Sequence, residues 1–168
     1  DTETWPFKIK HHFTHKTGAC NARNIALNAV NSDWVFLADD DIVLKTNFIE
    51  KAGIIINQLS YKAYTFSCYL KNETPTFKFV KQWENFGSGC SFVKADALKD
   101  IKFSKAFEHG FGEDADFGMQ LRNKGVDIVY LPEPSILHLK APIGGFRVQP
   151  ELAWKDDDVQ PKPSPTVM

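Results

Sequence analysis

The sequence has few cysteines, almost no net charge and no long apolar run. Cys20, Cys68 and Cys90 form an odd, widely spaced set, which excludes a disulfide framework and a Cys-x-x-Cys metal site. Reduced thiols are the simplest interpretation, with one disulfide and a free thiol as the alternative.

The net charge of −1 provides no basic field for nucleic acid. No apolar run approaches the ~20 residues of a membrane span. We therefore expect a cytoplasmic protein, either free or peripheral to the cytoplasmic membrane.

The composition is that of one globular domain. The 168 residues are 43% hydrophobic, include 14 phenylalanines and are 24% charged, which provides enough apolar surface for a core. The last residues are rich in aspartate and then in proline, and such a segment cannot build a core. We predict a domain over residues 1–153 and a tail over 154–168.

The first half alternates between strand and helix patterns. Residues 7–13 alternate in hydrophobicity and predict a strand. Apolar residues at helical spacing over 22–30 predict a helix with Thr17 as its N-cap. The continuous apolar run 34–38 is typical of a strand buried on both faces of a parallel sheet.

The second half combines helices with β-rich segments. Thr46 is predicted to cap a helix that carries apolar residues from 48 to 59. Residues 61–93 are predicted to form a β-rich insertion, and a helix begins near Gly112 and ends at Gly125. With further strands at 127–131 and 135–138, the pattern predicts an α/β fold whose mixed sheet is flanked by helices. Ligands of such sheets lie beyond the carboxyl ends of strands.

Three adjacent carboxylates, Asp39, Asp40 and Asp41, stand at one such strand end. They repel one another unless a cation neutralises them, and hard cations such as Mg²⁺ or Mn²⁺ prefer oxygen ligands. The alternative is a solvated acidic turn.

Three other patterns have both a functional and a structural interpretation. The acidic segment 112–116 opens a helix, where it provides a general base or merely favours the helix dipole. His138 follows an apolar strand and is either packed or a further ligand of an ion held by Asp41. The Gly87-Ser88-Gly89 loop allows a close approach of backbone to ligand, or only makes a turn.

The order of these motifs resembles glycosyltransferase family 2, the inverting class with the GT-A fold. Gly18-Ala19-Cys20-Asn21-Ala22-Arg23-Asn24 is similar to the family's G-x-x-x-ARN helix. It is followed by the strand that ends in the aspartate triplet, in place of the DxD motif. Phe111-Gly112-Glu113-Asp114-Ala115-Asp116 resembles the acceptor-side ED segment, and Leu131-Pro132 and His138 continue the pattern.

This resemblance implies a metal-dependent transfer of a sugar from a nucleoside-diphosphate sugar to a hydroxyl acceptor. It implies that Asp41 and His138 bind Mn²⁺ or Mg²⁺ and that Asp114 is the catalytic base. Glu113 would assist in binding the acceptor or the donor sugar. A single base on the opposite face of the sugar would invert the anomeric centre.

The remaining site residues are carried over in the same way. Asp39 would lie near the ribose or donor sugar with Asp40 in support, and Arg23 would lie near the donor. Gly87, Ser88 and Gly89 would line the sugar pocket. The donor is expected to be a UDP-sugar carrying a hexose or N-acetylhexosamine. The acceptor would be a saccharide, a lipid-linked sugar or a protein, and polysaccharide biosynthesis is the expected setting.

The resemblance also implies that the family's first strands, which bind the nucleotide, are missing before residue 7. The sheet edge exposed by such a truncation would favour a homodimer. Two other functions stay open: a non-catalytic fragment that binds sugar or a partner, and a metal-dependent nucleotidyltransferase or phosphatase.

Overall fold

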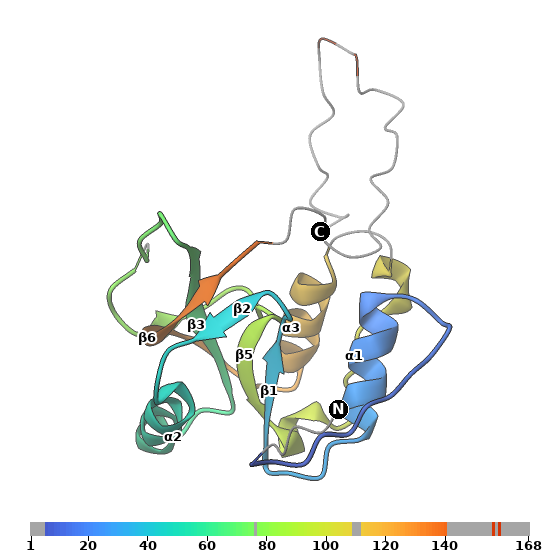
Figure 1. Ribbon diagram of the computed structural model, residues 1–168, viewed down its shortest axis with the longest axis horizontal. Coiled ribbons are helices and arrows are strands. Elements are labelled where there is room, and N and C mark those ends of the chain that lie inside the picture. Colours follow the sequence, from blue (N-terminus) through green and yellow to red (C-terminus); the bar gives the residue numbers. More distant parts are fainter. Residues whose placement is uncertain (1–5, 76, 109–111, 141–155, 157, 159–168) are drawn as a thin grey trace.

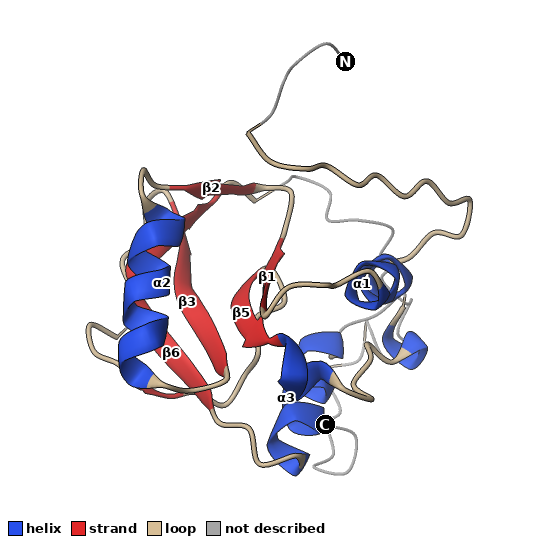
Figure 2. Cartoon of the chain, turned by 90° about the horizontal axis from the view of Figure 1, so that it is seen from below, coloured by secondary structure: helices blue, strands red, loops and turns tan. Residues whose placement is uncertain are grey.

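The computed structural model describes residues 6–75, 77–108, 112–140, 156 and 158. Its centre is a six-stranded mixed sheet that is covered by helices on both faces (Figure 1, Figure 2). The strands are β1 (Trp34–Ala38), β2 (Ile42–Leu44), β3 (Ala63–Leu70), β4 (Lys81–Gln82), β5 (Cys90–Lys94) and β6 (Ile128–His138). The helices are α1 (Ala19–Asn28), α2 (Phe48–Leu59) and α3 (Glu113–Asn123), with 3-10 turns η1 (Ala95–Leu98) and η2 (Lys105–Phe107). The predicted α/β fold with a mixed sheet is confirmed.

The strand order is β1-β5-β3-β6-β2, and β4 pairs with β6. β3 and β6 are parallel at the centre, whereas β1 with β5, β5 with β3, and β6 with β2 are antiparallel. As a result β1, β3 and β6 all run in the same direction. The carboxyl ends of these three strands lie at the same end of the sheet, together with the start of β5.

Each face of the sheet has its own hydrophobic core. α2 covers one face through Phe48, Ala52 and Ile56, which pack against aromatic residues such as Phe66 and Phe92. On the other face, α1 and α3 cover residues such as Val93 and Ile128. The two faces are thus sealed by apolar contacts, and polar side chains gather at the strand ends.

The short link between β1 and β2 imposes a curl on the sheet. These strands lie at opposite ends of the strand order, and only Asp39, Asp40 and Asp41 separate them. In a flat sheet four inter-strand spacings amount to roughly 19 Å. The chain from Ala38 to Ile42 can span at most about 14 Å. The sheet must therefore curl so that the aspartate triplet lies across the strand ends.

The N-cap position of α1 lies one residue after the predicted Thr17, and a distant side chain caps the helix. Gly18 precedes the helix with φ +128°, a value that favours glycine. The Glu108 carboxylate accepts hydrogen bonds from the backbone N–H groups of Cys20 at 2.8 Å and Asn21 at 3.0 Å. A Cβ on Gly18 would lie 2.1 Å from Glu108 Oε1. The prediction of Thr17 as N-cap was wrong, because this carboxylate occupies the helix start.

Three other local predictions were also wrong. Residues 7–13 form no strand, since they pair with no strand of the described sheet, and Phe7, Ile9 and Phe13 are exposed. β1 is an edge strand antiparallel to β5, so it is not buried on both faces of a parallel sheet. α2 is preceded by Asn47 in a left-handed conformation, which displaces Thr46 from the cap position.

The other predicted elements are present. The β-rich segment 61–93 supplies β3, β4 and β5, and β3 lies at the centre of the sheet. The predicted strands 127–131 and 135–138 are one continuous strand, β6. The predicted tail 154–168 lies outside the described residues except for Asp156 and Asp158. Among the helices of the described ranges, we find none of the length and apolarity that a membrane crossing requires.

The carboxylate cap of α1 leads to a stability prediction. We expect Glu108→Ala to lower the free energy of unfolding by about 1–2 kcal/mol, because two backbone N–H groups and the positive helix end lose their partner. Urea denaturation measures this loss. Glu50→Ala, which removes an exposed carboxylate from the first turn of α2, is the matched control. Equal effects of the two substitutions would show that Glu108 has no special role as a cap.

Candidate active site

The register of the strands brings the predicted site residues to one end of the sheet. Ala38 at the end of β1 pairs with Cys90 at the start of β5. At the other side of the sheet, His138 at the end of β6 pairs with Ile42 of β2 and also with Leu70 of β3. The aspartate triplet lies between these two pairings, so it is held next to both the glycine loop and His138.

Arg23 links the helix motif to two of the predicted carboxylates. Its Nη2 donates to Asp39 Oδ1 at 3.1 Å, and its Nη1 lies 3.6 Å from Glu113 Oε1. The Glu113 side chain is only 6% exposed, whereas that of Asp39 is 41% exposed. A buried carboxylate requires such a counter-charge. Arg23 therefore ties α1 to the end of β1 and to the start of α3.

The neighbouring Asn24 has a structural role. Its side-chain amide donates to the carbonyl of Phe103 at 2.9 Å and accepts from the N–H of Phe103 at 2.9 Å. The guanidinium of Arg23 lies 5.4 Å from the centre of the Phe103 ring. The segment after η1 is thereby fixed beneath the arginine, an arrangement that the sequence pattern does not reveal.

The glycine loop contacts both the aspartate triplet and α3. The N–H of Asp39 donates to the carbonyl of Gly89 at 3.2 Å, and a Cβ on Gly89 would lie 2.1 Å from Asp39 Oδ2. The N–H of Ser88 donates to Asp114 Oδ2 at 3.2 Å. Glycine at position 89 thus allows a close approach, and Ser88 orients the predicted base.

Asp114 has two unusual features, a raised pKa and a buried carboxylate oxygen with no hydrogen-bond partner among the described residues. Burial raises the pKa of this carboxyl above its usual value, although hydrogen bonds from Ser88 and the charge of Arg23 oppose the shift. Within the described part of the chain, its buried Oδ1 has no hydrogen-bond partner, and neither has the buried Nη1 of Arg23. Such orphaned polar atoms call for a ligand or an explanation.

Asp41 and His138 form a second pair. Asp41 Oδ2 lies 3.2 Å from His138 Nε2, and both side chains are partly exposed. Asp40, between the two groups, has an exposed side chain. The structure therefore brings Arg23, Asp39, Glu113 and Asp114 together with the glycine loop, and Asp41 together with His138.

The Asp41–His138 pair offers two ligands to a divalent cation. The carboxylate oxygen suits Mg²⁺ and Mn²⁺ alike, whereas the imidazole nitrogen is a ligand that Mn²⁺ accepts more readily than Mg²⁺. Within the described residues, no group of three or more His, Cys, Asp or Glu side chains is placed to hold an ion. These residues therefore form no all-protein cage around an ion.

A cavity of about 440 Å³ adjoins the predicted base. Glu113 and Asp114 line it from α3, and Gly87 lines it from the loop. Trp83 also forms part of its wall, and the sequence analysis did not identify this residue.

The thiols of Cys68 and Cys90 contact each other, and both lie near the negative charge of Asp39. Neither residue stands in a recognisable motif, so only the fold reveals them.

The raised pKa of Asp114 leads to a prediction that needs no substrate. This carboxyl stabilises the fold fully below its unfolded pKa, and that contribution is lost as the pH rises through the raised folded value. Both the Ser88 N–H and the Ser88 hydroxyl favour the ionised form of Asp114, and Ser88→Ala removes the hydroxyl alone. We therefore expect this variant to raise the Asp114 pKa further. Carbon-detected NMR titration of the carboxyl measures it, with Ser32→Ala as the control. An unchanged or lower pKa would contradict a contribution of the Ser88 hydroxyl.

A comparison with protein families identifies one that this chain matches. The family model for glycosyl transferase family 2 matches residues 3–113, a stretch that includes Arg23, the aspartate triplet and the glycine loop and ends at Glu113. No curated protein matches the chain.

Solved structures share the fold. S. aureus TarS 1–349 in complex with UDP-GlcNAc has a TM-score of 0.65 and 18% identity, over 83% of this chain and 44% of that one. A second S. aureus TarS structure has a TM-score of 0.61 and 19% identity, over 75% of this chain and 25% of that one. The chain thus spans less than half the length of either relative. Since the family model matches more than half of the sequence, the chain belongs to glycosyltransferase family 2, and its fold is that of the GT-A enzymes.

Proposed function

We propose that this chain carries the catalytic centre of an inverting glycosyltransferase that moves a sugar from a nucleoside-diphosphate sugar to a hydroxyl acceptor. The observation that carries the proposal is that two groups, Asp114 and the Asp41–His138 pair, lie at the same end of the sheet. Asp114 offers a buried carboxylate oxygen that lacks a hydrogen-bond partner among the described residues, and the Asp41–His138 pair lies beyond the glycine loop. Membership of glycosyltransferase family 2 supports the same reaction class.

The proposed base is Asp114. Its Oδ2 is held by the Ser88 N–H, which leaves Oδ1 to accept the hydrogen of an acceptor hydroxyl. A raised pKa makes the carboxylate a stronger base than an exposed aspartate. The hydroxyl oxygen then bonds to the anomeric carbon as the bond from that carbon to the β-phosphate oxygen breaks, and the proton passes to Asp114. One displacement inverts the anomeric centre.

The residues around Arg23 are proposed to bind the donor. Asp39 is partly exposed and oriented by Arg23, so it can accept hydrogen bonds from ribose or sugar hydroxyls. Glu113 is held by the same guanidinium and lines the cavity beside Asp114. A UDP-linked hexose or N-acetylhexosamine is the donor that we propose, since S. aureus TarS, a structure with this fold, is described in complex with UDP-GlcNAc.

Asp41 and His138 are proposed to hold Mn²⁺ or Mg²⁺ against the donor diphosphate. A bound divalent cation supplies charge neutralisation for the leaving nucleoside diphosphate without proton transfer. Asp40 would add negative potential at the rim of this site. The setting that we propose is cytoplasmic polysaccharide biosynthesis, which is compatible with the free thiols of Cys20, Cys68 and Cys90.

Donor binding is tested by calorimetric titration of the chain with UDP, GDP, dTDP and CMP, each with Mn²⁺ and with chelator. We expect one nucleotide to bind in a metal-dependent manner, and Asp41→Asn to weaken that binding at least about tenfold, because a metal ligand is lost. Asp33→Asn, a carboxylate at the opposite end of β1, is the control. Equal affinity with metal and with chelator would contradict the assigned ligands.

The base is tested by Asp114→Asn. We expect release of nucleoside diphosphate from the bound nucleotide sugar to fall by about 10²–10⁴-fold, because general base catalysis is lost, while donor affinity is retained. Asp116→Asn is the matched control, since Asp116 lies on the same helix turn and accepts a hydrogen bond from Gln120.

Two results would overturn this assignment. Turnover of Asp114→Asn at the wild-type rate would exclude Asp114 as the base. Release of pyrophosphate or inorganic phosphate in place of nucleoside diphosphate would favour a nucleotidyltransferase or a phosphatase.

A further inference from the structure

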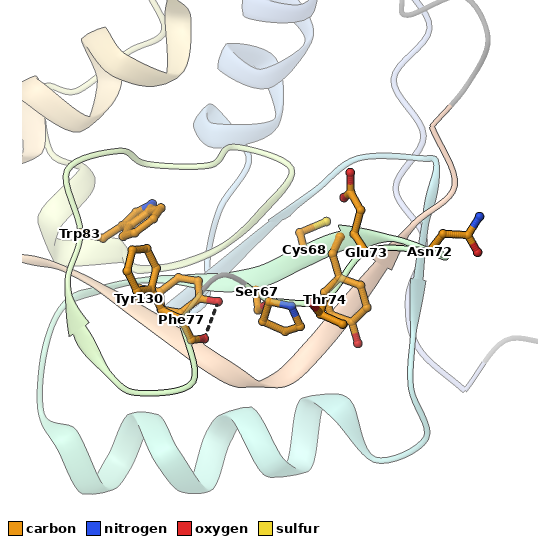
Figure 3. Close-up of a pocket in the computed structure, with 10 residues that line it drawn as sticks. Ser67, Cys68, Asn72, Glu73, Thr74, Phe77, Trp83 and Tyr130 are labelled. Carbon is orange, nitrogen blue, oxygen red and sulfur yellow. Dashed lines mark hydrogen bonds between the residues drawn. The ribbon is translucent and has the colours of Figure 1, made fainter.

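A second cavity, of about 570 Å³, shares the residue Trp83 with the cavity that Asp114 lines. We call it the aromatic pocket. Rings of Phe77, Trp83 and Tyr130 form one end, and the other end is lined by polar groups that include Ser67, Asn72 and Thr74 (Figure 3). It follows the second half of β3 and the loop after it. The pocket thus combines an aromatic wall with hydrogen-bonding groups.

The aromatic end is a rigid assembly. The rings of Trp83 and Tyr130 have centres 5.0 Å apart with planes 34° apart, and the Phe77 ring lies 5.7 Å from Trp83. The Tyr130 hydroxyl donates to the carbonyl of Phe77 at 3.3 Å, which fixes the loop against the strand (Figure 3). The ammonium of Lys81 lies 4.0 Å from the Phe77 ring centre and 5.1 Å from that of Trp83. These contacts hold the wall in place before any ligand binds.

Trp83 connects the aromatic pocket to the proposed reaction centre. It lines this pocket and also the cavity that contains Glu113 and Asp114. The two cavities follow one another along β3, since Thr65 lines the cavity at Asp114 and Ser67 lines the aromatic pocket. A ligand longer than one sugar ring could therefore present a hydroxyl to Asp114 and extend past Trp83.

The charge of the lining indicates what kind of ligand fits. Among the described lining residues, Glu73 is the one ionisable carboxylate, and no Lys, Arg or His is present. Two cations stand next to the lining, but both are engaged: Lys81 lies on the Phe77 and Trp83 rings, and Lys45 donates to Ser135 and to the Tyr69 hydroxyl. This arrangement favours an uncharged ligand over a phosphate. Sugar rings suit the pocket because their C–H faces pack on aromatic rings while their hydroxyls bond to serine, asparagine and threonine.

We propose that the aromatic pocket binds a neutral oligosaccharide, the acceptor whose terminal hydroxyl reaches Asp114. This inference rests on the proposed function, because it names the acceptor class of the same site. Trp83 is the specificity-determining residue: its ring contacts the sugar unit next to the one that reacts. A neutral saccharide is thus favoured over a lipid phosphate or a peptide.

The backbone around Trp83 makes its side chain a suitable test position. The Trp83 N–H donates to the carbonyl of Ile128 at 2.8 Å, and its carbonyl accepts a hydrogen bond from Arg122. Both bonds involve main-chain atoms, so they persist when the indole is replaced. Trp83→Phe keeps a ring in the wall and serves as a milder second variant.

The experiment is a calorimetric titration of the chain with three neutral tetrasaccharides, namely cellotetraose, maltotetraose and chitotetraose, and separately with UDP and Mn²⁺. We expect at least one tetrasaccharide to bind. Trp83→Ala should weaken it about tenfold, since ring packing is lost, with a smaller loss for Trp83→Phe and unchanged UDP affinity. Tyr61→Ala, an exposed tyrosine remote from this pocket, is the matched control.

Three outcomes would overturn the inference: failure of all three tetrasaccharides to bind, equal affinity in the wild type and both Trp83 variants, or a loss of UDP affinity in those variants. Circular dichroism identifies a variant that does not fold, and Trp83→Phe then decides. Failure of the proposed function looks different. In that case no nucleotide binds, yet saccharide binding still depends on Trp83, and the pocket belongs to a non-catalytic sugar-binding protein.

Discussion

The three-residue link between β1 and β2 is the constraint on which the site depends. Because Asp39, Asp40 and Asp41 must connect opposite ends of the strand order, the sheet curls and the link lies across the ends of the intervening strands. Pairing of β1 with β5 places Asp39 against the glycine loop, and pairing of β2 with β6 places Asp41 against His138. The short link keeps these two groups close to each other.

The positive charge of Arg23 compensates some of the neighbouring carboxylates more fully than others. One guanidinium contacts both Asp39 and Glu113, so these two carboxylates are largely compensated. Asp114 receives weaker support, and burial raises its pKa. The result is a set of neighbouring carboxylates, of which two are oriented by an arginine and the third, Asp114, has a pKa raised by burial. General base chemistry requires this kind of difference between neighbouring groups.

Local patterns predicted some elements well and others poorly. The apolar spacing of Phe48, Ala52 and Ile56 correctly identified the buried face of α2, because helical periodicity depends on nearby residues alone. The alternation over 7–13 failed because a strand requires a partner for its backbone groups. Thr17 failed as a cap because the carboxylate of Glu108, far away in the sequence, occupies the start of α1.

The sequence by itself determined the family, the order of the motifs and the α/β class, because these depend on residue types and local spacing. Only the tertiary structure decided which residues meet. Asp41 reaches His138 because β2 pairs with β6, and Arg23 reaches Glu113 because α1 and α3 pack into the same hydrophobic core. The wall formed by Trp83 and Tyr130 arises in the same way, since β4 pairs with β6 beside it. Contacts of this kind depend on strand order and curl, which no local pattern encodes.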